Sequence, residues 1–412
     1  MKLEISPMDS NSDRRARLSH ILRILIGGLS AAVALLAVIE PRSWEMLVLK
    51  IGVTEWGHVF ALPAAVALLP KRQRDRMAWI GHALGFLAAL LSLSSLGRAR
   101  HLARRLPGQF RGVFGDAEPR AMPAAPPRPA PLVLADVLRG VRLGPSRKRR
   151  LAYIQRGERA LELDLYQPMH ATEAALCLVV VHGGSWQSGD SNQIPELNSY
   201  LAARGYIVAA LNYRLLPEHP FPAARDDLLA AIGYLKTNAA DLGIDPRQFV
   251  LLGRWAGGQL ALLVAYTATD PAIRGVIAFY PPSDLVYGYD HPARKAVHDG
   301  IPVIERYLGG SPTNMPEIYA AAAPITHAGP ECPPTLLIHG GRDNLVSPVQ
   351  SERLARRLAA ASCQHFYLNL PWATHGCDVN FSGPSGQIST YTIERFLAAV
   401  TSDPRSEAKI RE

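Results

Sequence analysis

Hydrophobic and polar positions divide the chain into two regions with different patterns. Up to about residue 96, long apolar runs alternate with short basic segments. From about Leu151 onwards, apolar segments of strand length alternate with segments of helical periodicity. Strands that alternate with helices are typical of a mostly parallel sheet with helices on both faces. The pattern therefore predicts an α/β domain at 151–402, preceded by a helical region and followed by a short tail at 403–412.

Three apolar runs in the first region are long enough to cross a bilayer as helices. They cover residues 21–39, 46–69 and 77–96, and a polar, basic N-terminus at 1–20 precedes them. A cleaved signal peptide is the competing interpretation of the first run, but no small-residue cleavage site follows it. We therefore expect a multi-pass membrane region at 21–96 with about three transmembrane helices.

The distribution of basic residues bears on the membrane orientation, because cytoplasmic loops are rich in Lys and Arg. The basic N-terminus and the basic loop at 71–76 both favour the cytoplasm, which places the rest of the chain outside. Four arginines just beyond the third run favour the opposite orientation: Arg98, Arg100, Arg104 and Arg105. The orientation stays open, with an extracytoplasmic α/β domain preferred.

Residues 97–150 are rich in proline and arginine, with seven prolines between positions 107 and 131. Such a composition predicts an extended or disordered linker. A basic patch at 147–150 ends this segment. We interpret the patch as a solvated charge run, with contact to anionic lipid as the alternative.

Charge and cysteine content narrow the classes of partner. The net charge is +9, and residues 1–150 carry 24 Lys and Arg against 10 Asp and Glu. Because these arginines flank apolar runs, membrane lipid explains them better than nucleic acid does. The four cysteines are too few and scattered for a disulfide framework or a zinc site, so we expect free thiols, with a Cys332–Cys363 bridge left open. No metal or organic cofactor is implied.

The segment at 249–261 combines a strand, a sharp turn and a helix. An apolar run ends at Gly253, and a helix-forming run follows Gly257. This arrangement corresponds to the Gly-x-Ser-x-Gly nucleophile elbow, in which a strained turn presents a serine hydroxyl above a sheet. The two glycines are in place, but Trp255 occupies the serine position. Tryptophan has no nucleophilic oxygen, so no covalent acyl-enzyme can form at this residue.

Three further motifs follow predicted strands. The turn His182-Gly183-Gly184-Ser185-Trp186 has glycines whose backbone amides can approach a substrate oxygen, as in an oxyanion hole. Asp343 and His375 each follow a later strand, so both belong at the carboxyl edge where parallel sheets place their chemistry. Along the chain the elbow comes first, then Asp343, then His375, which is the order expected when these groups act together. His375 would then act as general base and Asp343 would orient it.

From about Leu151 to Val400 the chain resembles an α/β-hydrolase of the carboxylesterase type, near the hormone-sensitive-lipase-like and feruloyl-esterase-like branches. The resemblance rests on LELDLYQP, HGGSW, NYRLLPEHPFPAARDD, GRWAGG, HGGRD and ATHG. It implies the α/β-hydrolase fold and the hydrolysis of small esters or lipid-like esters. It also implies oxyanion donors at Gly183, Gly184 and Ala256, and an acid and base at Asp343 and His375. The position that matches the family's serine is Trp255.

No other serine provides an equivalent nucleophile in the sequence. Ser185 and Ser188 belong to the oxyanion turn and its loop, and Ser385 comes after His375, out of the expected order. If the elbow residue has a positive φ, the bulky Trp255 side chain is also strained there.

Three hypotheses follow from an elbow without its serine. In the first, the chain has lost catalysis and binds a ligand or partner. In the second, a single base change, from serine TCG to tryptophan TGG, has inactivated an otherwise intact esterase. In the third, His375 and Asp343 activate water directly. A transporter would need the three apolar runs to be the main part of the protein, and they are short beside the α/β domain. We expect a membrane-anchored hydrolase with lost or strongly impaired activity, the alternative being an inactive protein that binds a ligand or partner at the membrane.

Overall fold

The computed structural model describes residues 9–69, 76–119, 125–169 and 174–401. Most of the basic loop predicted at 71–76, the start of the polar N-terminus and the tail at 403–412 lie outside the described residues. The chain divides into two compact units, a helical unit at Met1–Arg98 and an α/β unit at Ala99–Glu412. Each unit is described separately below.

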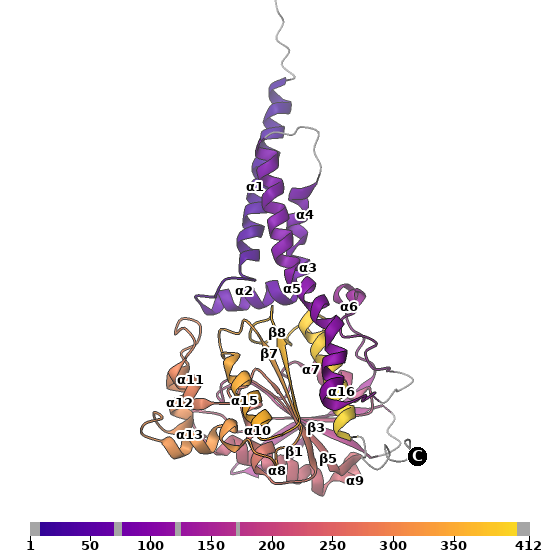
Figure 1. Ribbon diagram of the computed structural model, residues 1–412, viewed down its shortest axis with the longest axis vertical. Helices are drawn as coiled ribbons and strands as arrows, with labels where there is room; N and C mark the ends of the chain where they lie inside the picture. The colour runs from indigo at the N-terminus through magenta and orange to yellow at the C-terminus, as the bar shows by residue number, and fades with distance from the viewer. Residues whose placement is uncertain (1–8, 70–75, 120–124, 170–173, 402–412) are drawn as a thin grey trace, which may run out of the picture. The chain divides into compact units, whose positions relative to one another are not determined.

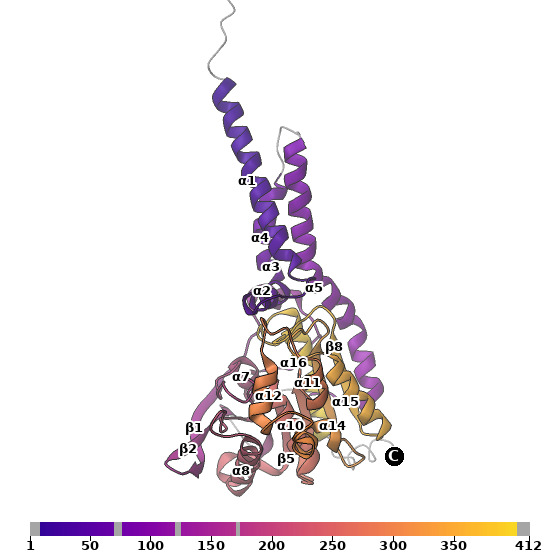
Figure 2. The same cartoon turned by 90° about the vertical axis from the view of Figure 1, so that its left-hand side faces the viewer.

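The helical unit is built from α1 (Asp9–Leu35), α2 (Trp44–Glu55), α3 (Gly57–Phe60), α4 (Leu62–Leu68) and the first part of α5 (Arg76–Phe114). In Figures 1 and 2, α1, α4 and this part of α5 run alongside one another. Small residues allow the close approach, because a Cβ at Gly27 would lie 3.1 Å from the Leu84 Cβ. Two helices in the described residues, at Leu18–Leu35 and in α5, are long and apolar enough to span a membrane.

The second apolar run differs from the expected single helix. It is bent by 95° between Trp44–Glu55 and Gly57–Leu68, so it counts as a third span only if the bent pair is taken as one. Lys50 is buried on this segment and its Nζ donates to the Ile39 carbonyl at 3.1 Å. At the bend, Gly57 has no room for a side chain, since a Cβ there would lie 2.0 Å from the Ser92 carbonyl oxygen. Polar and close-packing requirements therefore interrupt a run that hydrophobicity alone predicts to be continuous.

The α/β unit contains an eight-stranded sheet with the order β1-β2-β4-β3-β5-β6-β7-β8. The strands are β1 (Ser146–Arg156), β2 (Arg159–Pro168), β3 (Ala175–Val181), β4 (Ile207–Leu211), β5 (Ile244–Arg254), β6 (Ile273–Phe279), β7 (Thr335–Gly340) and β8 (His365–Leu370). Both pairings of β2 are antiparallel, and the pairings from β4 to β8 are parallel. The mostly parallel sheet predicted from the alternating pattern is confirmed.

Helices cover both faces of this sheet. One face packs against α7 (Pro195–Ala202), α16 (Pro384–Thr401) and the end of α5, and the other against α8 (Ala223–Thr237), α10 (Ala256–Thr267) and α15 (Val349–Ala360). Alternate residues of β3 serve the two faces: Leu178 packs in one core and Val179 in the other. This two-sided burial explains why the central strands are almost continuously apolar. The short helix α9 (Ala239–Leu242) leads into β5.

The stretch 282–328 forms the helical insert that its lack of a strand pattern predicts. It contains α11 (Leu285–Asp290), α12 (Gly300–Leu308), α13 (Pro316–Ala322) and α14 (Pro324–His327). Figure 1 shows α11, α12 and α13 gathered at one side of the sheet. Of these helices, α11 and α12 contribute residues to the lining of the pocket described below.

The basic patch at 147–150 belongs to β1, and its four residues are exposed, in agreement with the solvated charge run expected from the sequence. Figure 2 shows β1 and β2 as a hairpin at one edge of the sheet. Arg150 lies opposite Asp164 of β2, and its Nε donates to the Asp164 carboxylate at 2.9 Å. Ser191 also donates to this buried carboxylate, at 2.6 Å. A buried acidic partner on the neighbouring strand therefore stabilises the pairing of this basic segment in the sheet.

The third apolar run continues far beyond its expected end near residue 96. Helix α5 extends to Phe114 and contains Pro107, although proline usually interrupts a helix. Leu106 and Phe110, one turn apart, are buried in the core of the α/β unit. The Phe110 ring contacts the Phe366 ring of β8 edge to face, with centroids 5.4 Å apart. Packing against a distant strand thus stabilises a helix that its local sequence does not predict.

Part of the predicted linker is also packed rather than extended free of the domain. It contains the short helix α6 (Leu134–Arg139), and both backbone amides and arginine side chains make hydrogen bonds to the rest of the α/β unit. Arg128 is buried and donates to Gln387 at 2.5 Å, while its backbone amide donates to Glu394 at 2.9 Å. Arg204 of the adjacent loop donates to the Pro126 carbonyl at 2.9 Å. The described residues from 125 to 143 therefore belong to the α/β unit.

We expect Leu106→Ala to lower the free energy of unfolding of the α/β unit by about 2–5 kcal/mol, as for other fully buried leucines. Leu106 has no exposed surface, whereas Leu138 of α6 is 75% exposed. Leu138→Ala is therefore the matched control, with an expected change within about 0.5 kcal/mol. Chemical denaturation of the full chain in detergent micelles measures both. Equal effects of the two substitutions would contradict the packing of α5 described here.

Candidate active site

The elbow at the end of β5 has the strained geometry expected of it. Trp255 has φ 50° and ψ −116° and is the residue before α10. A Cβ at Gly253 would lie 2.0 Å from the Gly257 carbonyl oxygen, and a Cβ at Gly257 would lie 2.3 Å from the His182 carbonyl oxygen. Only glycine fits at these two positions. The φ of Trp255 is positive, so a large aromatic residue occupies a backbone conformation that is uncommon for non-glycine residues.

The indole of Trp255 lies among histidine rings at the carboxyl edge of the sheet. Its ring contacts the His375 ring edge to face at a centroid distance of 4.9 Å. On another side it contacts the His298 ring at 5.4 Å, also edge to face. The side chain is half-buried. An aromatic ring therefore fills the space between the elbow and His375, where a nucleophile and a reacting carbonyl would lie.

Asp343 and His375 are brought together as the sequence predicts. Asp343 follows β7, His375 follows β8, and the His375 Nδ1 lies 2.7 Å from the Asp343 Oδ2. The other oxygen of Asp343 accepts the backbone amides of Leu345 at 2.8 Å and Val346 at 3.0 Å. The His375 Nε2 is buried and has no hydrogen-bond partner within the described ranges. The pair thus directs one unoccupied imidazole nitrogen towards the elbow side of the site.

Electrostatics keep the Asp343 carboxyl ionised. Burial alone would raise its pKa, but the neighbouring His375 and His339 rings, both in hydrogen-bonding contact, hold it well below its ordinary range. The His339 Nε2 lies 3.2 Å from the Asp343 Oδ2, and its Nδ1 lies 2.7 Å from the Ser351 hydroxyl. An anionic Asp343 can stabilise a protonated His375, which is the role of the acid in such a pair.

The glycine turn after β3 lies beside the elbow, but its amides are not all available. The Gly183 amide donates to the Gln193 side-chain oxygen at 2.7 Å. The amides of Gly184 and Ala256 have no protein acceptor in the described part of the chain. Gly184 has φ 120°, and a Cβ there would lie 2.1 Å from the Ser188 carbonyl oxygen. Two of the three predicted oxyanion donors are therefore unoccupied, and the third already has an acceptor.

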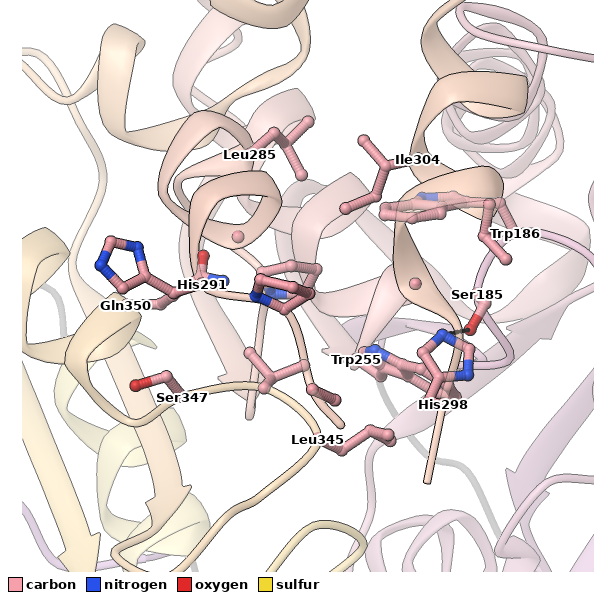
Figure 3. A pocket seen from close by; sticks show the side chains of 17 residues that line it. Ser185, Trp186, Trp255, Leu285, His291, His298, Ile304, Leu345, Ser347 and Gln350 are labelled. Carbon is pink, nitrogen blue, oxygen red and sulfur yellow. Dashed lines mark hydrogen bonds between the residues drawn. The ribbon is translucent and has the colours of Figure 1, made fainter. Parts of the chain in front are cut away.

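A pocket opens in front of Trp255. Figure 3 shows Trp255, Ser185 and His298 together on one side of this pocket, with Trp186 and Ile304 above them. Most of the lining is apolar, including Leu285, Val303, Ile304, Leu345 and Val346. A pocket of this kind suits a small, largely apolar ligand with few polar groups.

Two features of the site have no signal in the sequence pattern. His298 lies in the helical insert, after no predicted strand, and only the fold brings it beside Trp255. Behind the site, Arg254 is buried next to the elbow and its Nε donates to Asp378 at 2.5 Å. The same carboxylate accepts the Tyr280 hydroxyl at 2.6 Å, and the Tyr280 ring contacts the His375 ring at 4.4 Å. This network ties the His375 loop to the elbow strand.

The other serines considered from sequence have different surroundings. Ser188 is exposed, and its hydroxyl donates to the Gly184 carbonyl at 3.2 Å. Ser385 begins α16 and accepts the Trp372 indole hydrogen at 2.9 Å, away from the pocket lining. Ser185 does line the pocket.

The four cysteines are free thiols, so the bridge left open between Cys332 and Cys363 is absent from this structure. Both sulfurs contact Gly329: Cys332 accepts its amide at 3.3 Å and Cys363 donates to its carbonyl at 2.5 Å. Within the described residues, no three His, Cys, Asp or Glu side chains are grouped as metal ligands would be.

The buried His182 makes stability depend on pH. Its ring stacks on Tyr213 at a centroid distance of 4.3 Å, and its Nδ1 donates to the Gly183 carbonyl at 2.8 Å. Burial lowers the pKa of His182 below its ordinary value, despite this hydrogen bond. The unfolded chain therefore binds a proton near pH 6.5 that the folded chain does not. Stability from this group is present above pH 6.5 and is lost as pH falls through the folded pKa.

We expect the free energy of unfolding to fall as the pH drops below about 6.5, by up to about 1.4 kcal/mol per pH unit for this one proton. Denaturant titrations of the full chain at stepped pH measure the slope. His182→Gln should flatten it, and His219→Gln, at an exposed histidine, should not. An unchanged slope in His182→Gln would contradict the assignment.

Comparison with known proteins gives consistent findings for the α/β unit. The BD-FAE family model matches residues 163–358. The probable carboxylic ester hydrolase LipM of Mycobacterium tuberculosis is 30% identical over 261 residues, covering 59% of this chain and 59% of that protein. The esterase LipC of the same organism is 31% identical over 240 residues, covering 56% of this chain and 59% of that protein. The chain thus spans about three fifths of the length of these curated relatives.

A solved structure supports the same fold. The bacterial heroin esterase superposes with a TM-score of 0.56 and 22% sequence identity, covering 65% of this chain and 89% of that chain. At this level of identity the likeness concerns the fold alone.

Proposed function

We propose that this chain, which belongs to the carboxylesterase and lipase type of the α/β-hydrolase superfamily, is a membrane-anchored ester hydrolase whose nucleophile position is held by Trp255. Hydrolysis is then lost or strongly impaired. One observation carries the proposal: a complete Asp343–His375 pair, 2.7 Å apart, faces an elbow whose central residue has no nucleophilic oxygen.

The proposed roles are those that the residues of the site would have in a chain with a serine at the elbow. His375 would take the proton of a hydroxyl at the elbow through its unoccupied Nε2, and Asp343 would hold the ring and stabilise its charged form. The amides of Gly184 and Ala256 would stabilise the oxyanion, and Gly183 would join them after releasing Gln193. No step requires a metal or an organic cofactor.

The substrate we propose is a small carboxylic ester or a lipid-like ester. The mostly apolar pocket suits such a molecule, and the relatives LipM and LipC are named as ester hydrolases.

Membrane anchoring is supported by the apolar helices of the helical unit. The helix at 18–35 and the apolar part of α5 have the length and composition of membrane spans. We propose that they anchor the chain in a lipid bilayer, with the α/β unit preferred on the extracytoplasmic side. Alkaline carbonate washing of membranes tests the anchor: the full chain should stay in the membrane pellet, and its release into the supernatant would contradict anchoring.

The experiment on catalysis compares the full native chain with its His375→Ala variant on p-nitrophenyl butyrate in detergent micelles. Without a nucleophile at the elbow, removing the base should change turnover by less than about ten-fold. A fall of about 10³-fold would show that His375 already works in the native chain, for instance by activating water, and would overturn the proposal.

The alternative function is binding of a ligand or partner at the membrane without hydrolysis. The edge-to-face contacts of Trp255 with His375 and His298 favour it, because they place an aromatic wall in the pocket. Calorimetric titration with phenyl butyl ketone, an uncleavable ester analogue, tests this function. Saturable binding that Trp255→Ala weakens at least ten-fold supports it, and absence of binding to the native chain excludes it for this class of ligand.

A further inference from the structure

A serine and a histidine that do not belong to the Asp343–His375 pair lie beside Trp255 in the pocket. Ser185 is on the turn that follows β3, and His298 is in the insert between α11 and α12. The Ser185 hydroxyl lies 3.5 Å from the His298 Nε2, the contact drawn as a dashed line in Figure 3. Both side chains line the pocket, so a ligand in it would meet them.

The surroundings of Ser185 resemble those of a nucleophile more than its sequence position suggests. It follows a central parallel strand and has φ 55°, close to the 50° of Trp255 at the elbow. It is only 3% exposed, so its hydroxyl is shielded from bulk water. Neighbouring Ser188 differs, because it is exposed and its hydroxyl is turned to the Gly184 carbonyl.

His298 is suited to accept a proton at neutral pH. Burial, and then the nearby His375, lower its pKa below the ordinary value, although the Asp299 carboxylate opposes the shift. A neutral imidazole can therefore take the Ser185 proton at Nε2. The distance of 3.5 Å is long for this transfer, but such contacts commonly shorten once substrate is bound.

We propose that Ser185 and His298 form a second nucleophile and base, which accept acyl or phosphonyl groups from activated esters while Trp255 blocks the elbow. The substrate class rests on the proposed function. With an activated ester, the Ser185 oxygen bonds to the acyl carbon, the bond to the phenolate leaving group breaks, and the serine proton passes to His298. Water then cleaves the acyl-serine and restores both side chains.

This pair reacts more slowly than a complete triad. Within the described residues, no carboxylate accepts a hydrogen bond from the His298 Nδ1 to orient the ring. Good leaving groups, such as p-nitrophenolate or fluoride, are therefore required. Esters of simple alcohols are not substrates for this pair.

Labelling with a fluorophosphonate tests the proposal on the full native chain in detergent micelles. The serine oxygen displaces fluoride from phosphorus, so the chain gains one phosphonyl group. Peptide mass mapping should find the adduct on the peptide that contains Ser185. Ser185→Ala should remove it, Ser188→Ala should leave it, and His298→Gln should slow labelling at least ten-fold.

The outcomes separate this proposal from the proposed function. Absence of an adduct on the native chain, or an adduct on another residue, overturns the role of Ser185 whatever the folding of the variants. Labelling at the same rate in His298→Gln overturns the role of His298. A gain of ester hydrolysis in Trp255→Ser, whether or not Ser185 is also replaced by Ala, tests the proposed function at the elbow. It does not test the role of Ser185.

Discussion

Trp255→Ser should raise the turnover of p-nitrophenyl butyrate by at least about 10³-fold over the native chain. Loss of the serine from a comparable triad costs roughly 10⁶-fold in turnover, and the base and acid needed to use a new hydroxyl are already 2.7 Å apart. The smaller side chain also vacates the space beside His375 that the indole occupies. Steady-state rates of the two full chains in detergent micelles measure the gain.

Trp255→Ala is the matched control for this gain. It opens the same space and relieves the same crowding at φ 50°, but it supplies no hydroxyl. We expect it to remain within about ten-fold of the native chain, since a covalent step at the elbow is still impossible. A gain below ten-fold in Trp255→Ser would mean that the pocket has changed beyond its nucleophile, and the binding function would then be favoured.

Asp343→Asn, introduced into the Trp255→Ser chain, should lower turnover by about 10⁴-fold. In a Ser-His-Asp triad the same change has this effect because the amide leaves the histidine in the wrong tautomer. Here the carboxylate accepts two backbone amides through one oxygen and contacts His375 and His339 through the other. An amide cannot accept at both positions with the same strength.

The exposed Asp241 of α9 provides the control for this loss. Asp241→Asn in the same Trp255→Ser chain should leave turnover unchanged, because the side chain is on the surface and outside the pocket lining. Thermal unfolding of both double variants checks that the buried substitution does not simply unfold the α/β unit. A loss of less than ten-fold in the folded Asp343→Asn chain would exclude Asp343 as the orienting acid.

The central strands were predictable because their burial on both faces produces short, continuous apolar runs. The apolar segments of strand length at 175–181 and 335–339 correspond to β3 and β7. Strand ends then locate Asp343 and His375, since parallel strands place their carboxyl ends on one edge of the sheet.

Elements that depend on distant partners were not predictable. The strand β1 is locally basic, and only the buried Asp164 on β2 explains its place in the sheet. The end of α5 contains Pro107, a local signal against a helix, and is held by rings such as Phe366 that lie far along the chain. His298 reaches the pocket through the helical insert, whose path no periodicity specifies.

The most direct test of the central claim is the pre-steady-state burst of p-nitrophenolate. It should be measured with the double variant Trp255→Ser, Ser185→Ala, in which the elbow has its serine and Ser185 can no longer react. An intact site lacking its serine predicts a burst approaching one p-nitrophenolate per chain, lost when His375→Ala is added, because acylation then precedes a slower deacylation. Absence of a burst, together with turnover no higher than that of the native chain, would contradict the claim that only the nucleophile is missing.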